Sequence, residues 1–319
     1  VATATFAAAK PGLWIHPGKA HAGDVRVVDI GIPDGAPVEI EVGLIGPAAL
    51  DAIPRRQPGD TKFSSGHVLV CGGSPGLTGA PAMAALAAAR AGAGYVTACV
   101  PEAVQPILAA KLTEVMTLGL PDDGAAEVVL ERAARGAVVL GPGIGRASPA
   151  AALARELARR VPTPLVLDAD GLDAHAGRLA DLRDRPAATV LTPHEGELAR
   201  LLEVDVADVK ARRLEHAREA RRRSGAIVVL KGDDTIVAGD AVGVNPLSAP
   251  MLATAGTGDV LSGVIGALLA KRVDPFTAAC AAVRLHAHAG RLAAERVGSP
   301  EGVIASDVIA ALPRARGWQ

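Results

Sequence analysis

From residue 66 onward, the chain alternates short apolar runs with helix-length, alanine-rich segments, and this alternation constrains the fold more than any other feature. The runs do not alternate apolar with polar residues, as a strand with one face in water would. Strands that are apolar on both faces and separated by helices indicate a mostly parallel sheet covered by helices on both faces. The sequence therefore predicts an α/β fold.

The predicted elements extend almost to the end of the chain. The predicted strands are 67–71, 95–100, 115–120, 137–140, 165–168, 189–192, 227–231 and 235–238. The predicted helices are 80–91, 125–135, 149–160, 195–202, 206–224, 258–270, 275–297 and 306–312. Before residue 60 there are two short β-like runs, 25–30 and 38–44, among many prolines. We expect an N-terminal segment of residues 1–55 and one main domain of residues 56–319.

Composition excludes several classes of protein. A net charge of −1 and 2% aromatic residues argue against nucleic acid as a partner. The uncharged stretch 68–89 is long enough for a membrane helix, but its glycines and prolines break the backbone hydrogen bonding that lipid demands. Three cysteines, far apart, favour neither a disulfide framework nor a zinc site, and no signal peptide is visible. We expect a cytoplasmic protein without a membrane helix.

Ligands of an open parallel sheet bind beyond the carboxyl ends of the strands, so motifs that directly follow strands are the candidates. Residues 72–79 are rich in glycine and contain G-x-S-x-G, the pattern of a serine hydrolase elbow. The next helix begins too late for an elbow, which favours a loop that approaches a ligand and ends near Ala80. Residues 141–145, around Gly143, form a second glycine-rich turn, with a spacing that differs from a dinucleotide fingerprint. A tight turn without a ligand remains an alternative for 72–79, and the close approach of another backbone remains one for 141–145.

Charged residues follow three further strands. Asp168 and Asp170, the first two acids of 168–173, stand at a strand's carboxyl end and suit a metal or a hydroxyl, unless one of them caps the next helix. His194 and Glu197 lie where the next helix begins, although acids in a first helical turn are stabilised by the dipole without any function. Lys231 ends a buried run and places a cation beside the crevice, unless it is the solvated end of a hairpin.

The most specific motif is Gly-Thr-Gly-Asp at 256–259, which opens an uncharged helix. Backbone N–H groups at a helix N-terminus, with glycines that let them close around a ligand, form an anion hole. A carboxylate at Asp259 repels a phosphate bound there, unless it serves as the base that deprotonates an attacking hydroxyl. The motif is not a P-loop.

This motif near the end of an α/β sheet resembles the ribokinase-like superfamily. Within it, the chain resembles the ADP/ATP-dependent NAD(P)H-hydrate dehydratases over about residues 60–312. Six motifs carry the resemblance: Gly-Gly-Ser-Pro-Gly-Leu-Thr-Gly-Ala, Gly-Pro-Gly-Ile-Gly, Asp-Ala-Asp-Gly-Leu, Thr-Pro-His-Glu-Gly-Glu, Lys-Gly-Asp-Asp-Thr and Gly-Thr-Gly-Asp. Residues 6–14 and 27–33 are similar to the end of the NAD(P)H-hydrate epimerase domain that precedes the dehydratase in bifunctional bacterial proteins. Most of that domain is absent, so we expect no epimerase activity.

The resemblance implies an activity and a set of residues. The S epimer of NADH or NADPH hydrate would be phosphorylated on its ring hydroxyl by ADP or ATP with Mg²⁺, and loss of phosphate would restore NAD(P)H. The anion hole and base would be Gly256, Gly258 and Asp259, and the hydrate would contact Ala80, Gly143, His194 and Asp259. The nucleotide would contact Lys231, Gly232, Asp233, Asp234, Thr235 and Gly258, and Glu197 would reach Mg²⁺ through water. The resemblance also implies a homo-oligomer, with a tetramer as the candidate.

Two alternatives stay open at this point. One is a ribokinase-like kinase of a vitamin precursor that keeps its phosphorylated product, and the other is a non-catalytic nucleotide-binding protein. The stretch 245–255 departs from the glycine- and asparagine-rich pattern of the family, and Leu77 replaces a common aromatic residue. The choice between ADP and ATP is therefore left open.

Overall fold

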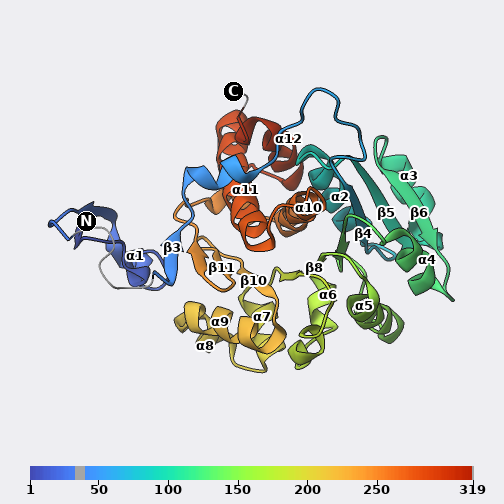
Figure 1. The fold of residues 1–319 in the computed structure, drawn as a ribbon, viewed down its shortest axis with the longest axis horizontal. Coiled ribbons are helices and arrows are strands. Elements are labelled where there is room, and N and C mark those ends of the chain that lie inside the picture. The colour runs from blue at the N-terminus through green and yellow to red at the C-terminus, as the bar shows by residue number, and fades with distance from the viewer. Residues whose placement is uncertain (33–39, 318–319) are drawn as a thin grey trace.

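The structure, a computed structural model, describes residues 1–32 and 40–317 and is built on a ten-stranded sheet (Figure 1). The strand order is β3-β12-β11-β10-β9-β8-β7-β4-β5-β6. Neighbours are parallel from β10 through β6, whereas β11 is antiparallel to both β10 and β12. The predicted mostly parallel sheet is confirmed, and it aligns the carboxyl ends of its central strands along one edge.

The strands of this sheet are β3 (Val42–Leu44), β4 (His67–Cys71), β5 (Tyr95–Pro101), β6 (Met116–Leu120), β7 (Ala137–Leu140), β8 (Leu165–Leu167), β9 (Thr189–Leu191), β10 (Ile227–Leu230), β11 (Ile236–Ala238) and β12 (Val242–Val244). The longer helices are α2 (Gly79–Arg90), α3 (Gln105–Lys111), α4 (Ala125–Arg132), α5 (Ser148–Arg160), α7 (Glu195–Leu202), α8 (Val206–Ala211), α9 (Arg213–Ser224), α10 (Thr257–Ala270), α11 (Pro275–Val297) and α12 (Ala305–Ala315). Two four-residue helices, α1 (Lys19–Ala22) and α6 (Asp170–Asp173), complete this set.

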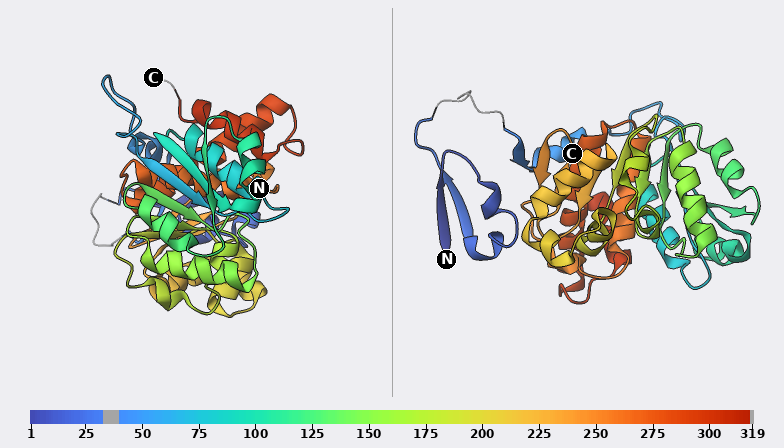
Figure 2. Two further views of the ribbon diagram at one scale, coloured as in Figure 1. Left: turned by 90° about the vertical axis from the view of Figure 1, so that its right-hand side faces the viewer. Right: turned by 90° about the horizontal axis from the view of Figure 1, so that it is seen from below.

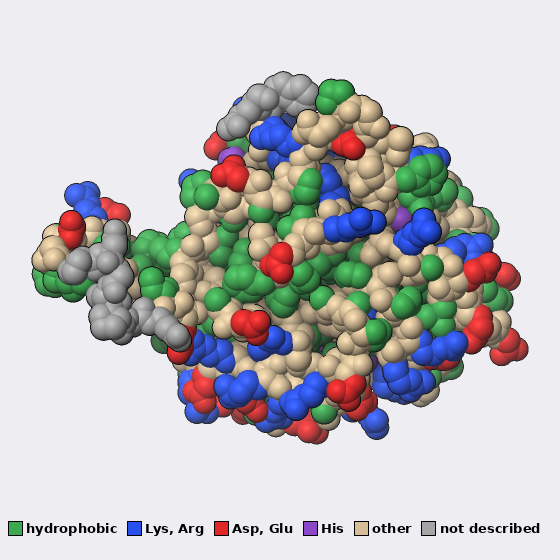
Figure 3. Space-filling model, viewed as in Figure 1, with side chains coloured by type: hydrophobic (Ala, Val, Ile, Leu, Met, Phe, Trp, Pro, Cys, Tyr) green, Lys and Arg blue, Asp and Glu red, His purple; other side chains and the backbone are tan. Residues whose placement is uncertain are grey.

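Helices cover both faces of the sheet, as the uniformly apolar strands require (Figures 1 and 2). One apolar core includes buried residues of α2, α10, α11 and α12, and a second core includes residues of α4, α5, α7 and α9. Charged side chains follow the lower margin of the molecule in Figure 3, while apolar side chains gather in the middle of that face. Within residues 1–32 and 40–317, no helix is both long and apolar enough to cross a bilayer.

Helix α10 is buried along almost its whole length and packs closely against α2 and the sheet. A Cβ atom added at Gly263 would lie 2.1 Å from the carbonyl oxygen of Ala84 in α2. A Cβ atom at Gly266 would lie 2.6 Å from Cγ2 of Val139 in β7. The glycines therefore let α10 approach both neighbours, and this close packing fixes the position of its N-terminus.

The N-terminal segment forms a small sheet of its own and then joins the main sheet. Strands β1 (Ala2–Phe6) and β2 (Asp24–Val28) pair in parallel, and the unit lies at one end of the molecule (Figure 2). Strand β3 pairs in parallel with β12 at the edge of the main sheet, and Ile45 and Ile53 are buried in its core. The proposed boundary at residue 55 thus follows residues that pack on the main sheet.

Several predicted elements differ from those observed. The predicted helix 206–224 is two helices, because Arg213 turns inward to pair with Asp234 and interrupts the helix at Arg212. The sequence analysis missed β1, β12, α1, α3 and α6, which are short, and the predicted strand 38–44 is confirmed only for Val42–Leu44. Residues 38 and 39 of that run, and Pro33 of the epimerase-like motif, lie outside the described residues.

We predict that Gly263→Ala lowers the free energy of unfolding by about 1–3 kcal/mol, because the added methyl group forces α10 away from α2. Gly43→Ala in β3 is the matched control, since a Cβ atom there meets nothing within 4 Å. Urea unfolding of both variants measures the difference. Equal free energies of unfolding for the two variants would show that a methyl group fits between α2 and α10 without cost.

Candidate functional site

The motifs predicted to carry chemistry meet at the carboxyl edge of the central strands. Lys231 directly follows β10, Asp168 directly follows β8, and Glu197 lies in the first turn of α7, just beyond β9. The N-terminus of α10 lies beside Lys231, since a Cβ atom at Gly258 would be 3.4 Å from the Lys231 ammonium nitrogen. The edge therefore brings together one cation, several carboxylates and a helix N-terminus.

Lys231 is the centre of this cluster. Its Nζ lies 3.1 Å from Asp168 Oδ1 and 3.5 Å from Glu197 Oε2, and its side chain is 20% exposed. Burial lowers the pKa of Lys231, but the two carboxylates outweigh burial and hold the pKa above its usual value. The Lys231 ammonium group is therefore charged and fixed by two carboxylates. Lys231 is not the solvated end of a hairpin.

The carboxylates beside Lys231 are themselves fixed by hydrogen bonds. Asp168 accepts a hydrogen bond of 2.8 Å from the Thr192 hydroxyl. Glu197 accepts one of 2.7 Å from the His194 backbone N–H, and the His194 Nδ1 atom accepts from the backbone N–H groups of Gly196 and Glu197. This reciprocal capping begins α7 and leaves the His194 ring 55% exposed at the rim of the site.

Asp259 lies in the first turn of α10, and its carboxyl group is mostly withdrawn from water. Burial, reinforced by the neighbouring Asp168 carboxylate, raises the pKa of Asp259 to about 7, although Lys231 opposes this rise. Gly256 precedes the helix with a φ of +89°, a left-handed conformation that favours glycine. A carboxyl group with this pKa can exchange its proton near neutral pH, as a general base must.

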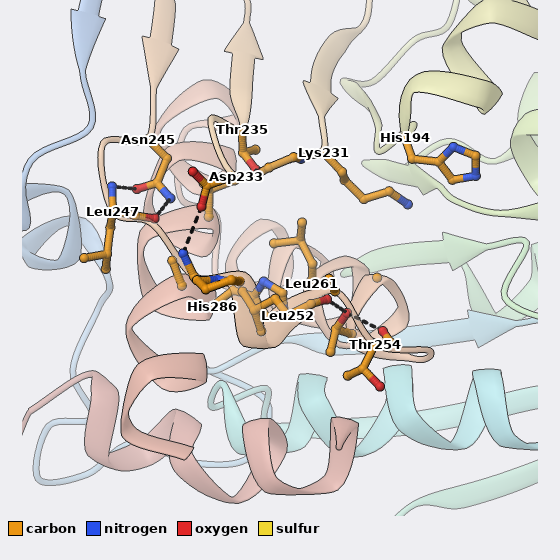
Figure 4. A pocket seen from close by; sticks show the side chains of 18 residues that line it. His194, Lys231, Asp233, Thr235, Asn245, Leu247, Leu252, Thr254, Leu261 and His286 are labelled. Carbon is orange, nitrogen blue, oxygen red and sulfur yellow. Dashed lines mark hydrogen bonds between the residues drawn. The ribbon is translucent and has the colours of Figure 1, made fainter. Parts of the chain in front are cut away.

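A cavity of about 480 Å³ extends from Lys231 and Gly258 toward α11 (Figure 4). Leu252, Leu261 and Val283 contribute its apolar lining. Of the residues named in the sequence analysis, the cavity is lined by His194, Lys231, Gly232, Asp233, Thr235 and Gly258. The cavity thus joins an apolar region to the charged cluster.

Other predicted residues lie outside the cavity lining. The Asp234 carboxylate is buried in an ion pair with Arg213, 3.0 Å away, and points into the protein. A Cβ atom at Gly143 would lie 3.3 Å from Cβ of Ala80, so these two residues are neighbours at the start of α2. A Cβ atom at Gly256 would meet the Met83 sulfur of α2 at 2.5 Å. The start of α2 is thereby linked to the anion-hole loop.

Among the polar residues of the cavity wall that the sequence analysis did not single out are Asn245 and His286. Asn245 fixes the loop after β12 by a 3.1 Å hydrogen bond to the Leu247 carbonyl oxygen. His286 lies in α11, is only 7% exposed, and burial lowers its pKa to about 4. In the sequence, the only sign of a role for His286 is its place inside an alanine-rich helix. The packing of α11 against α10 is what shows that His286 faces the cavity.

Among residues 1–32 and 40–317, no group of three or more His, Cys, Asp or Glu side chains is arranged to hold a metal ion. Asp168 and Glu197 are both engaged with Lys231. Mg²⁺ that arrives with nucleotide phosphates needs only one or two protein carboxylates and keeps several waters. Asp168 and Glu197 therefore fit a Mg²⁺ ion that the nucleotide phosphates also bind, and they do not surround an ion by themselves.

Comparison with known proteins assigns the chain to a family. The family model for NAD(P)H-hydrate dehydratase matches residues 68–314. The chain belongs to the NAD(P)H-hydrate dehydratase family. The predicted family membership is thereby confirmed.

Relatives within the NAD(P)H-hydrate dehydratase family are of two kinds. The bifunctional NAD(P)H-hydrate repair enzyme Nnr of Salinibacter ruber is 42% identical over 98% of this chain, which spans 60% of that relative. The chain likewise spans about three fifths of the next relatives. The ADP-dependent (S)-NAD(P)H-hydrate dehydratase of Xanthomonas campestris is 37% identical, with 85% of this chain and 95% of the relative covered.

Solved structures confirm the fold of this family member. The ADP/ATP-dependent NAD(P)H-hydrate dehydratase of Bacillus subtilis, co-crystallized with ATP/Mg²⁺, has a TM-score of 0.73 and 28% identity. The match covers 84% of this chain and 94% of the Bacillus subtilis chain. A ribokinase-like superfamily protein of Enterococcus faecalis has a TM-score of 0.74 at 21% identity, which supports the predicted ribokinase-like fold.

We predict that Asp259→Asn stabilises the ligand-free protein at high pH. The folded pKa of about 7 lies above the ordinary value of 3.8, so the folded state keeps a proton that the unfolded state releases between these pH values. Stability of the parent is therefore lost as the pH rises from about 4 to 7. The variant should gain nothing at pH 4 and roughly 2–4 kcal/mol at pH 8. Thermal melts across this range test the effect, and a gain independent of pH would contradict it.

Proposed function

We propose that this protein catalyses the ADP- or ATP-dependent dehydration of the S epimer of NADH or NADPH hydrate, a repair reaction that restores NAD(P)H. The observation that carries the proposal is the meeting of Lys231 and the α10 N-terminus at one end of the cavity, with Asp259 in the first turn of that helix, just outside the cavity lining. The activities of the Xanthomonas campestris and Bacillus subtilis relatives supply the substrate and the nucleotide.

The cavity lining suggests the direction in which a nucleotide would bind. Leu252, Leu261 and Val283 offer an apolar surface for the base, while Lys231 and the N–H groups around Gly258 offer positive potential for phosphates. Gly232, Asp233 and Thr235 would contact the nucleotide between these ends. Asp234 would act indirectly, through its ion pair with Arg213 beneath this loop.

The proposed chemistry uses Asp259 as the base. Its carboxylate removes the proton from the ring hydroxyl of the hydrate, and the hydroxyl oxygen then bonds to the terminal phosphorus of the nucleotide while the phosphorus–oxygen bond to the leaving nucleotide breaks. Lys231 and the N–H groups of Gly256 and Gly258 neutralise the charge that develops on the phosphoryl oxygens. In the second step the carbon–oxygen bond breaks, phosphate departs with the bonding electrons, and the adjacent ring carbon loses a proton, which restores the dihydronicotinamide ring.

The hydrate would lie against Ala80 and Gly143, on the side of Asp259 away from the nucleotide, and it would also contact His194, which lines the cavity. Bound Mg²⁺ would neutralise phosphate charge, and Glu197 would orient one of its water ligands. Glu197 is already held in place by the His194 N–H group, so it can accept from a water without moving.

Three further expectations belong to this proposal. Residues 1–55 would be the end of an epimerase-like domain, as the match to 98% of the chain in a bifunctional relative supports. The enzyme would be cytoplasmic and a homo-oligomer, with a tetramer as the candidate.

A vitamin kinase remains the second candidate, because the same anion hole and base would serve it.

The deciding experiment is turnover of purified NADH hydrate with ADP and then with ATP, followed by the absorbance of NADH. We expect NADH and one equivalent of phosphate from the S epimer only. Asp259→Asn should reduce turnover by roughly 10²- to 10⁴-fold, as expected for the loss of a general base, while nucleotide binding is kept or tightened. A phosphorylated product that persists would favour the kinase, and turnover within a few-fold of the parent would remove Asp259 from the mechanism.

Lys231→Met should weaken nucleotide binding by about 1.5–3 kcal/mol, the scale of a lost hydrogen bond to a charged group. Because Asp168 and Glu197 would lose their cation, the melting temperature of the ligand-free variant must be measured as well. Lys210→Met is a matched control, since its ammonium group is 3.9 Å from Glu195 on the surface. Calorimetry that shows parental nucleotide affinity in a folded Lys231→Met variant would contradict the assignment.

A further inference from the structure

Lys19, in the N-terminal segment, reaches across to the loop between β10 and β11. Its Nζ lies 2.6 Å from Asp233 Oδ2 and donates a hydrogen bond of 3.0 Å to the Asp233 carbonyl oxygen. The Lys19 side chain is only 16% exposed. Next to it, the His16 backbone N–H donates a 2.7 Å hydrogen bond to Asp234 Oδ2. Residues 16 and 19 thus bind both acids of the loop.

Asp233 connects this contact to the cavity wall. Its Oδ1 accepts hydrogen bonds from the Ser248 hydroxyl, at 2.6 Å, and from the Ala249 backbone N–H, at 3.2 Å. Asp233 and Ala249 both line the cavity (Figure 4). Although burial raises the pKa of Asp233, the bonds from Lys19 and Ser248 outweigh it and lower the pKa below its usual value. One carboxylate therefore joins the N-terminal segment to the loop that walls the cavity.

The charges explain why this contact matters more than a surface ion pair. An exposed pair contributes little, because water screens it and two long side chains must be ordered. Here the lysine is mostly buried, and the carboxylate is also held by two other donors, so the hydrogen bonds are charge-assisted and ordered. Without Lys19, Asp233 would keep its burial and lose its partner charge, and the loop at 248–250 would lose part of its anchor.

We propose that Lys19 is a positioning residue for the nucleotide cavity: it holds Asp233 and, through Asp233, the wall formed by residues 248–250. The inference rests on the proposed function, since it assumes that the cavity takes the adenine nucleotide. Lys19 touches no reacting atom in this scheme. It acts on how well the nucleotide is held and not on the chemical step.

The test compares Lys19→Met with Lys10→Met. Lys10 is the matched control, because its ammonium group donates to backbone carbonyls of its own segment, those of Phe6 and Ala8, and contacts no acid among the described residues. We expect Lys19→Met to raise the Kd and KM for ADP or ATP about 5- to 50-fold, with kcat at saturating nucleotide within two-fold of the parent. Lys19→Arg, which keeps the charge, should recover most of the affinity. Lys10→Met should match the parent.

A second readout does not depend on the nucleotide. In the ligand-free protein, hydrogen exchange of residues 245–253 should be faster in Lys19→Met, and Asp233→Asn should produce the same change with no further increase in the double variant. Parental affinity or parental exchange in a folded Lys19→Met variant overturns the inference. If the parent binds no adenine nucleotide, the proposed function fails, and the exchange experiment alone then decides whether Lys19 holds the wall.

Discussion

The ammonium group of Lys231 is the point on which the site depends. A buried cation is unfavourable unless carboxylates compensate it, and here Asp168 and Glu197 both do so. Asp168 follows β8 and Glu197 lies in the first turn of α7, whereas Lys231 follows β10. The pairing of these charges therefore fixes β8, α7 and β10 relative to one another. The same negative charges help to keep Asp259 protonated up to about neutral pH. The same two carboxylates therefore hold the Lys231 ammonium group in place and raise the pKa of Asp259.

Much of the fold and part of the site could be predicted from the sequence, because both follow from local patterns. Uniformly apolar runs gave the parallel sheet, and motifs directly after strands gave Lys231, His194 and the helix N-terminus at Gly256 and Gly258. Such residues are placed by the strand or helix that carries them. The comparisons confirm the family and the fold, while the roles of individual residues stay predictions.

The features that could not be predicted depend on distant partners. Asp234 stands between residues that line the cavity, yet its side chain turns inward because Arg213 lies beneath the loop. That same arginine divides the predicted helix 206–224, because its side chain must reach the interior. Lys19 and His286 are ordinary residues in their local sequence, and only the packing of α1 and α11 brings Lys19 to Asp233 and His286 to the cavity wall. No local signal marks such pairings.

Strand β3 has a consequence for how the chain folds. It belongs to the first sixth of the sequence, but its partner is β12, with Val42 opposite Val242. During synthesis from the N-terminus, the backbone groups of β3 therefore remain without their sheet partner until most of the main domain has been made. Contacts between residues so far apart in sequence close large loops and slow folding. The edge of the sheet nearest the cavity loop is thus completed late, by a strand that is made long before its partner.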